Sequence, residues 1–524
     1  MATVKPSDGD DPSTASRPRF RCAQFCHQLP LQVLYPFTLP FAALLCSPGF
    51  ALNMMGAPRP CTWGSGLLAP AFLLMSGMPL LCIVFWALSA PVSDTVAAAT
   101  LRADLIHVLV VALVFRVAVT VKYAYIPPAT YRKRLREWAP TLERRQEQLI
   151  SGWQFLTPEK VRAEVAAAAE REPMDARPLF FLLHGDAALA RLCAELRCVD
   201  AGALVEGAAA EREAAAPGGA RVLAVPCVVL TEAIILAAER ESAAYARTAG
   251  AVNTAVALGA TAATAVVRAA CGVPQLGADA YQLLVIVTHW VANVLLMGAA
   301  LVFLNVMAVD HFRRARSNAL LGGLFAVQRG GDAPRAAPAL DLTVFENTRA
   351  FLATRRLLAA FGETYHERLV IITAICIAIY AAVAAYVLAV LVSAPPGGLG
   401  AMLSPFILLH VLVAPAFACI LAGLLQAARA NREMHGHAAV VVEAAVRARL
   451  ALGGGGGGGG AQAERAPPCF ALLKDTERLL RATGDAAAIK ILGFEVTDAL
   501  VKSFLGAWVS LETACVFQLL QKGF

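Results

Sequence analysis

The chain has 524 residues, of which 58% are hydrophobic and only 16% are charged, and its net charge is +7. A soluble domain has roughly 45–50% apolar and about 25% charged residues, so this balance excludes an ordinary soluble protein and is typical of a polytopic membrane protein. The Lys and Arg residues form no concentrated patch within a recognisable nucleic-acid-binding module, so we expect membrane lipid and no nucleic acid as a partner.

Residues 1–65 are predicted to form a cytoplasmic N-terminal region. The chain starts with a polar segment that lacks an apolar h-region, so no cleavable signal peptide is expected. Leu31–Leu52 is apolar but contains Pro36, Pro40 and Pro48, which break helices. We interpret it as a re-entrant or interfacial segment, with an additional span as the alternative.

Seven later segments are apolar enough to cross a membrane as helices, which takes about 20 residues each. Six lie within residues 66–427 and the seventh lies within residues 491–524: Leu67–Ala90, Leu105–Val121, Ala249–Cys271, Tyr281–Ala308, Leu369–Ser393, Leu403–Ala427 and Ala499–Leu520. A shorter apolar stretch, Val222–Ala238, leads into the third span through residues that favour helix. We predict one long helix that begins in the cytoplasm and continues into the membrane.

The distribution of Lys and Arg orients these spans. Basic segments follow the second, fourth and sixth spans, whereas the short segments 91–100, 272–280 and 394–402 between the other spans contain neither residue. Because Lys and Arg gather on the cytoplasmic side, residues 122–248, 309–368 and 428–490 are predicted to be cytoplasmic. The predicted fold is therefore an all-α polytopic membrane protein with seven transmembrane helices, the N-terminus inside and the C-terminus outside.

The cytoplasmic loops are predicted to be long helical extensions of the spans that pack into a bundle. The loop at 428–490 also contains Gly453–Gly460, a flexible linker. The chain contains no GxSxG, HExxH or Walker A motif and no GxGxxG after a strand, so we predict neither an enzyme nor a cofactor. The 13 cysteines are scattered without zinc-site spacing, so no metal site is predicted.

Polar residues follow one side of the final span. At about 100° per residue they share a sector of about 100° on a helix. The candidates are Lys502, Ser503, Gly506, Ser510, Thr513 and Gln521. Small residues allow close helix packing in lipid, whereas hydroxyl and amide groups also suit a water-filled path, and both interpretations stay open.

Three further residues are candidates for a ligand pocket. His289 and Trp290 lie in the fourth span, and His410 lies in the sixth, each in the outer half of its helix. Ionisable groups inside a span are costly and indicate function. The alternative is a neutral histidine that is hydrogen-bonded to a neighbouring helix.

The topology and the final span together resemble the insect-type chemoreceptor superfamily, which includes gustatory and odorant receptors and gustatory receptor-like proteins. The residues that carry the resemblance occur in the family's order: Gly493, Phe494, Asp498, Leu500, Gly506, Ala507 and Gln518. Leu511 and Glu512 stand where the family has Thr-Tyr, and Leu519 stands where it has Phe.

The resemblance implies a ligand-gated, cation-permeable channel of the plasma membrane that assembles as a homotetramer. The final helices would line a central pore, and a small-molecule ligand would bind among the other helices on the outer side. Lys502 would lie near the inner mouth, where a ring of positive charges repels cations. The alternatives are a secondary transporter with a path among His289, His410 and Arg116, and a non-conducting scaffold that acts through its intracellular helices.

Overall fold

The structure is a computed structural model. It describes residues 20–30, separate positions between 110 and 128, and residues 157–171, 179–184, 186–197, 204, 222–270, 280–326, 338–393, 413–453 and 460–521. Leu31–Leu52, Leu67–Ala90 and most of Leu105–Val121 lie outside the described residues. Helices account for 86% of the part that is described, so the predicted mostly helical character is confirmed.

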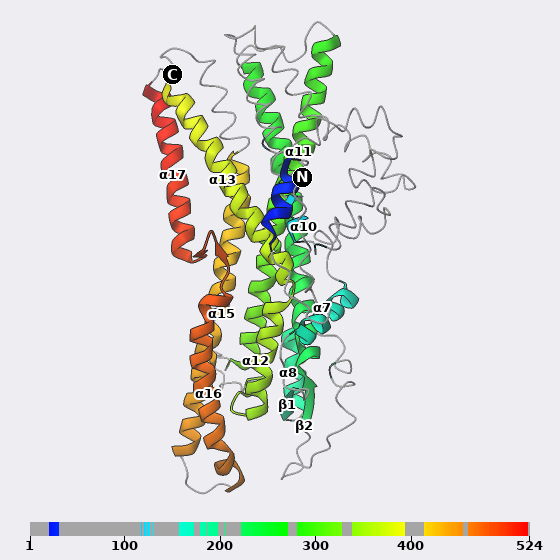
Figure 1. Ribbon diagram of the computed structural model, residues 1–524, viewed down its shortest axis with the longest axis vertical. Helices are drawn as coiled ribbons and strands as arrows, with labels where there is room; N and C mark the ends of the chain where they lie inside the picture. Colours follow the sequence, from blue (N-terminus) through cyan, green and yellow to red (C-terminus); the bar gives the residue numbers. More distant parts are fainter. Residues whose placement is uncertain are drawn as a thin grey trace, which may run out of the picture.

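The molecule is elongated, with its long helices roughly parallel to its longest axis (Figure 1). The long helices are α10 (Cys227–Ala270), α11 (Ala280–Phe325), α13 (Glu363–Ser393), α15 (Ala414–Gly453), α16 (Gly460–Ala487) and α17 (Asp498–Gln521). The shorter ones are α7 (Pro158–Arg171), α8 (Asp186–Leu196) and α12 (Phe345–Ala360). The C-terminal ends of α13 and α17 lie together at one end of the molecule, and α12 and α16 extend toward the other end (Figure 1).

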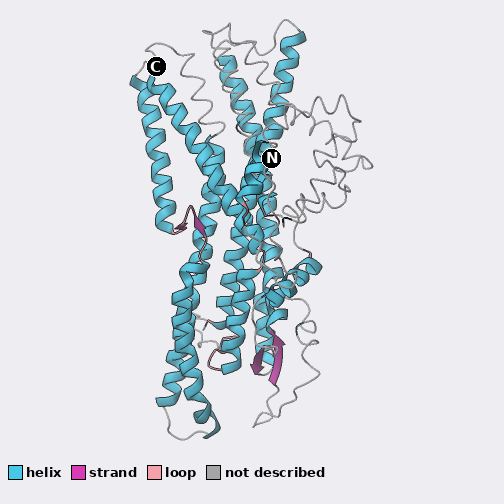
Figure 2. Ribbon diagram, viewed as in Figure 1, coloured by secondary structure: helices cyan, strands magenta, loops and turns pink. Residues whose placement is uncertain are grey.

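Two short antiparallel strand pairs interrupt the helical architecture (Figure 2). β1 (Phe180–His184) pairs with β2 (Val222–Pro226) at the end of the molecule where α12 lies, and Phe180 opposes Pro226. β3 (Lys490–Ile491) pairs with β4 (Phe494–Glu495) directly before α17. Both pairs connect helices rather than form an extended sheet.

The described residues form two main hydrophobic cores. The first joins α13, α15 and α17 to parts of α10 and α11, with Val387, Ile420 and Val501 among its buried members. The second joins β1, β2, α12 and α16 to the remaining parts of α10, α11 and α15. In the second core the rings of Phe181 and Phe351 both contact Phe325, with centroid distances of 5.8 and 5.1 Å.

Two of the described helices contain segments that are long and apolar enough to cross a membrane, namely Tyr365–Ala389 of α13 and Asp498–Gln518 of α17. They coincide with the predicted fifth and seventh spans. The third and fourth predicted spans fall within α10 and α11, except for Cys271, and part of the sixth falls within α15. The seven-span topology itself stays a prediction.

The helical extensions of the spans are present, with one correction. α10 runs without a break from Cys227 past Ala249, α11 continues from Ala308 to Phe325, and α12 precedes α13 as expected. However, Val222–Pro226 is a strand, so the prediction of helix over all of Val222–Ala238 is wrong for its first five residues. Valines favour a strand, and Pro226 has no N–H for a helix interior.

Candidate functional site

The final helix is attached to the rest of the molecule by the β3–β4 hairpin. Leu492 and Gly493 form its two-residue turn, with φ angles of +54° and +84°. Positive φ at both turn residues matches the twist of antiparallel strands, and glycine adopts it at little cost. Gly493 and Phe494, which carry part of the family resemblance, therefore belong to a turn and a strand, and α17 begins at Asp498, one residue before the predicted final span.

Side chains of α15 hold this hairpin. Asn431 Nδ2 donates to the carbonyl oxygens of Ile489 and Val496 at 3.1 and 2.9 Å, and its Oδ1 accepts from the Ile489 N–H at 2.8 Å. His435 Nε2 donates to Glu495 at 2.8 Å, and an exposed ion pair joins α15 to Asp498. The base of α17 is thereby fixed relative to α15.

One face of α17 packs against α13 and α15. Val501 and Cys515 are buried, and the rings of Phe504 and Trp508 stack on Phe417 of α15, with centroids 4.9 and 4.3 Å apart. At about 100° per residue, the polar stripe lies on the opposite side of the helix. All six stripe residues are exposed: Lys502, Ser503, Gly506, Ser510, Thr513 and Gln521.

Two of the stripe's three hydroxyl groups are satisfied by the helix itself. Ser510 Oγ donates to the Gly506 carbonyl at 2.9 Å, and Thr513 Oγ1 donates to the Val509 carbonyl at 2.8 Å. Such bonds allow hydroxyl groups to exist in a membrane without a partner on another helix. Leu505 and Val516 are also exposed and lie on an apolar flank beside the stripe. Phe517 is exposed within the sector of the stripe, so the helix has a packed face, a mainly polar face and an apolar flank.

The structure does not test the predicted ligand pocket. His289 and Trp290 lie in α11, where the structure describes the backbone but not these side chains, and His410 lies outside the described residues. Of the remaining residues that carry the family resemblance, Gln518 is half-buried in α17, and Asp498, Leu500, Gly506 and Ala507 belong to the same helix.

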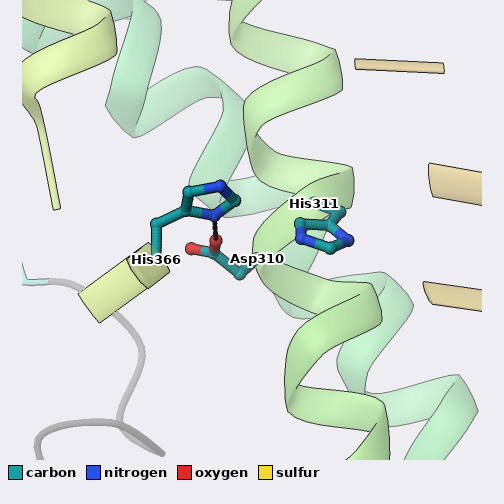
Figure 3. A group of neighbouring side chains, drawn as sticks. All are labelled: Asp310, His311 and His366. Atoms are coloured by element: carbon teal, nitrogen blue, oxygen red, sulfur yellow. Dashed lines mark hydrogen bonds and ion pairs between the residues drawn. The ribbon is translucent and has the colours of Figure 1, made fainter. Parts of the chain in front are cut away.

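A buried polar cluster that no local sequence motif marks lies between the two cores. Asp310 and His311 come from α11, and His366 comes from α13 (Figure 3). His366 Nδ1 donates to Asp310 Oδ2 at 3.2 Å, and Arg314 Nε donates to the same oxygen at 3.2 Å. Arg313 Nη1 lies 3.6 Å from the other carboxylate oxygen.

His311 occupies the contact between α11 and α15. Its Nδ1 donates to the Gly423 carbonyl at 3.0 Å, and its ring is fully buried. Gly423 lacks a side chain, and a Cβ there would overlap the terminal methyl group of Met307. A side chain at this position would therefore require the end of Met307 to move.

The charges of the cluster are balanced by ion pairs. Burial alone would raise the pKa of Asp310, but Arg314, the hydrogen bond from His366 and Arg313 outweigh it and hold that pKa well below its usual range. Arg313 also contacts Glu239 of α10, which is buried. Burial, together with the nearby His366, lowers the pKa of His311 to about 4, so this ring is neutral near pH 7.

The cluster has the donor set of a metal centre. One ligand atom from each of Asp310, His311 and His366 lies within 4.8 Å of the other two. The sequence could not identify the group because 56 positions separate Asp310 from His366. The feature of the sequence that could have pointed to the cluster is the pair Asp310-His311, which directly follows an apolar run. A charge buried at such a position requires partners.

No model of a known protein family matches the chain, and no curated protein matches it either.

Proposed function

We propose that the protein is a gustatory receptor-like, ligand-gated cation channel of the plasma membrane, in which the α17 helices of several copies line a shared pore. One observation carries this proposal: the polar stripe of α17 lies opposite the face that α17 packs against its own chain. A polar face gains nothing from contact with lipid tails, whereas it suits a water-filled path. Copies arranged around an axis would turn that face inward.

The number of copies is proposed from the family resemblance, which implies four. In such a tetramer Ser510 and Thr513 would face the pore, and Leu505 on the flank would face lipid or a neighbouring copy. Lys502, one turn into α17, would form a positive ring near the inner mouth and reduce cation permeation.

The test is the stoichiometry of the full-length protein in detergent, measured by mass photometry and by cryo-EM class averages. We expect a tetramer with α17 next to the symmetry axis. A monomer, or an oligomer with α17 on its outer surface, would contradict the proposal because the stripe would then have no shared path to line.

Substitution within the stripe provides a functional test. Ser510→Trp adds bulk where the pore is proposed, and Leu505→Trp adds bulk on the apolar flank of the same helix as a matched control. We expect Ser510→Trp to abolish the whole-cell current of the wild-type protein at unchanged surface expression, and Leu505→Trp to preserve it. Equal loss in both variants would contradict a pore on the stripe side.

A further inference from the structure

We propose that Asp310, His311 and His366 bind a divalent transition-metal ion of the zinc class. The site would lie where α11, α13 and α15 meet, between the two hydrophobic cores, and its ligands would join α11 to α13. It is independent of the pore proposed for α17.

Two of the donor atoms already have the spacing of metal ligands. Asp310 Oδ2 and His366 Nδ1 are 3.2 Å apart. Ligands about 2.0–2.1 Å from a tetrahedral zinc ion lie roughly 3.3 Å from one another. The third donor lies within 4.8 Å of both, so a modest movement of the His311 ring would complete the set. Metal binding would replace the present hydrogen bond, and neutral His366 would change tautomer, so that Nδ1 binds the ion and Nε2 carries the proton.

His311 supplies the second observation. Because Nδ1 donates to the Gly423 carbonyl, the neutral ring carries its lone pair on Nε2. This nitrogen is buried and has no hydrogen-bond partner among the residues that the structure describes. In Figure 3 the ring turns one nitrogen toward Asp310. A lone pair that faces a carboxylate, itself an acceptor, requires a donor or a cation between them.

The hydrogen bond from His311 to the backbone also resembles the usual support of a metal ligand. Histidines that bind metals donate their other N–H to a carbonyl or carboxylate, which fixes the ring and its tautomer. Two imidazoles and one carboxylate favour zinc and its neighbours over magnesium or calcium, which prefer oxygen donors.

The nearby arginines lower the affinity of this site for a cation. They also have partners outside the cluster, so they leave lone pairs on the ligand atoms available to the ion. Arg313 is balanced by Glu239, and Arg314 also donates to the carbonyls of Phe361 and Gly362 at 3.1 and 3.2 Å. Their charges disfavour an additional cation, so we expect weaker binding than at a closed four-cysteine site. The rival occupant is a single water molecule that donates to His311 and Asp310.

The experiment measures metal in the purified full-length protein by elemental mass spectrometry, after exposure to zinc sulfate and removal of free ion. His311→Gln and His366→Gln each remove one donor. His435→Gln is the matched control, because His435 also pairs with a carboxylate but lies outside the cluster. We expect about one zinc ion per chain in the wild type and the control, and about tenfold less in both cluster variants.

A second measurement covers the case in which a cluster variant does not fold. Cobalt added to the wild-type protein should give the intense visible absorption of a four-coordinate site, and zinc should abolish that absorption. Wild-type protein that retains no zinc and shows no cobalt spectrum would overturn the proposal in favour of the water molecule. Zinc retained equally in both cluster variants would also overturn it, because the ion would then lie elsewhere.

Discussion

At the scale of single residues, two buried asparagines bind backbone groups in the same way in separate parts of the molecule. Asn431 bonds Ile489 and Val496 beside the β3–β4 hairpin, and Asn347 of α12 bonds both the N–H and the carbonyl of Leu182 in β1, at 2.6 and 3.1 Å. Neither bond pattern is visible in the sequence, because each joins positions far apart in the chain.

Replacement of either asparagine by alanine would leave buried backbone groups without partners, at a cost of about 1–3 kcal/mol for each group. We expect Asn431→Ala to accelerate amide hydrogen exchange at residues 489–497 and to leave residues 179–184 unchanged. Asn347→Ala should have the reverse effect. If amide exchange rose in the same segments in both variants, the asparagines would not stabilise their own segments separately, and the prediction would be wrong.

At the scale of helices and strands, the long helices and α12 were predicted from the sequence, whereas the short strands were missed. α10, α11 and α13 were predictable because their apolar runs are long and the charged segments that flank α10 and α11 contain good helix formers. β2 was not, because it is continuous with the apolar run that enters α10. Strands β3 and β4 have two residues each, too few for a period that separates strand from helix. The buried cluster was missed for another reason: it depends on how α11 and α13 pack against each other, and the sequence pattern of a single helix does not predict that.

The β3–β4 turn gives a prediction at this scale. Gly493 has a φ of +84°, and a Cβ there would meet no atom within 4 Å. Gly493→Ala should therefore lower the midpoint of thermal unfolding through backbone strain alone, which costs roughly 1–2 kcal/mol for a left-handed residue. Gly506→Ala is the control, because a Cβ at this helical glycine also meets open space. A helical alanine is favourable, so the control should not lower the midpoint. Equal midpoints for the two variants would argue against a strained turn.

At the scale of the whole molecule, the arrangement of α16 and α17 predicts which parts lie on each side of the membrane. α17 starts at the hairpin beside α15 and ends next to the far end of α13, whereas α16 extends to the opposite end of the molecule (Figure 1). The basic residues that follow the sixth predicted span favour a cytoplasmic location for α16. The end of α17 should then lie outside the cell.

Thiol labelling tests this orientation with two exposed positions, Gln521 at the end of α17 and Arg478 on α16. A membrane-impermeant maleimide should label Gln521→Cys in intact cells. It should label Arg478→Cys only after permeabilisation, because the reagent cannot reach the cytoplasm. The labelling of the wild-type cysteines is subtracted in both cases. Labelling of Arg478→Cys alone in intact cells would reverse the proposed orientation. Labelling of both would mean that α17 does not cross the membrane, and the stripe on α17 could then not line a transmembrane pore.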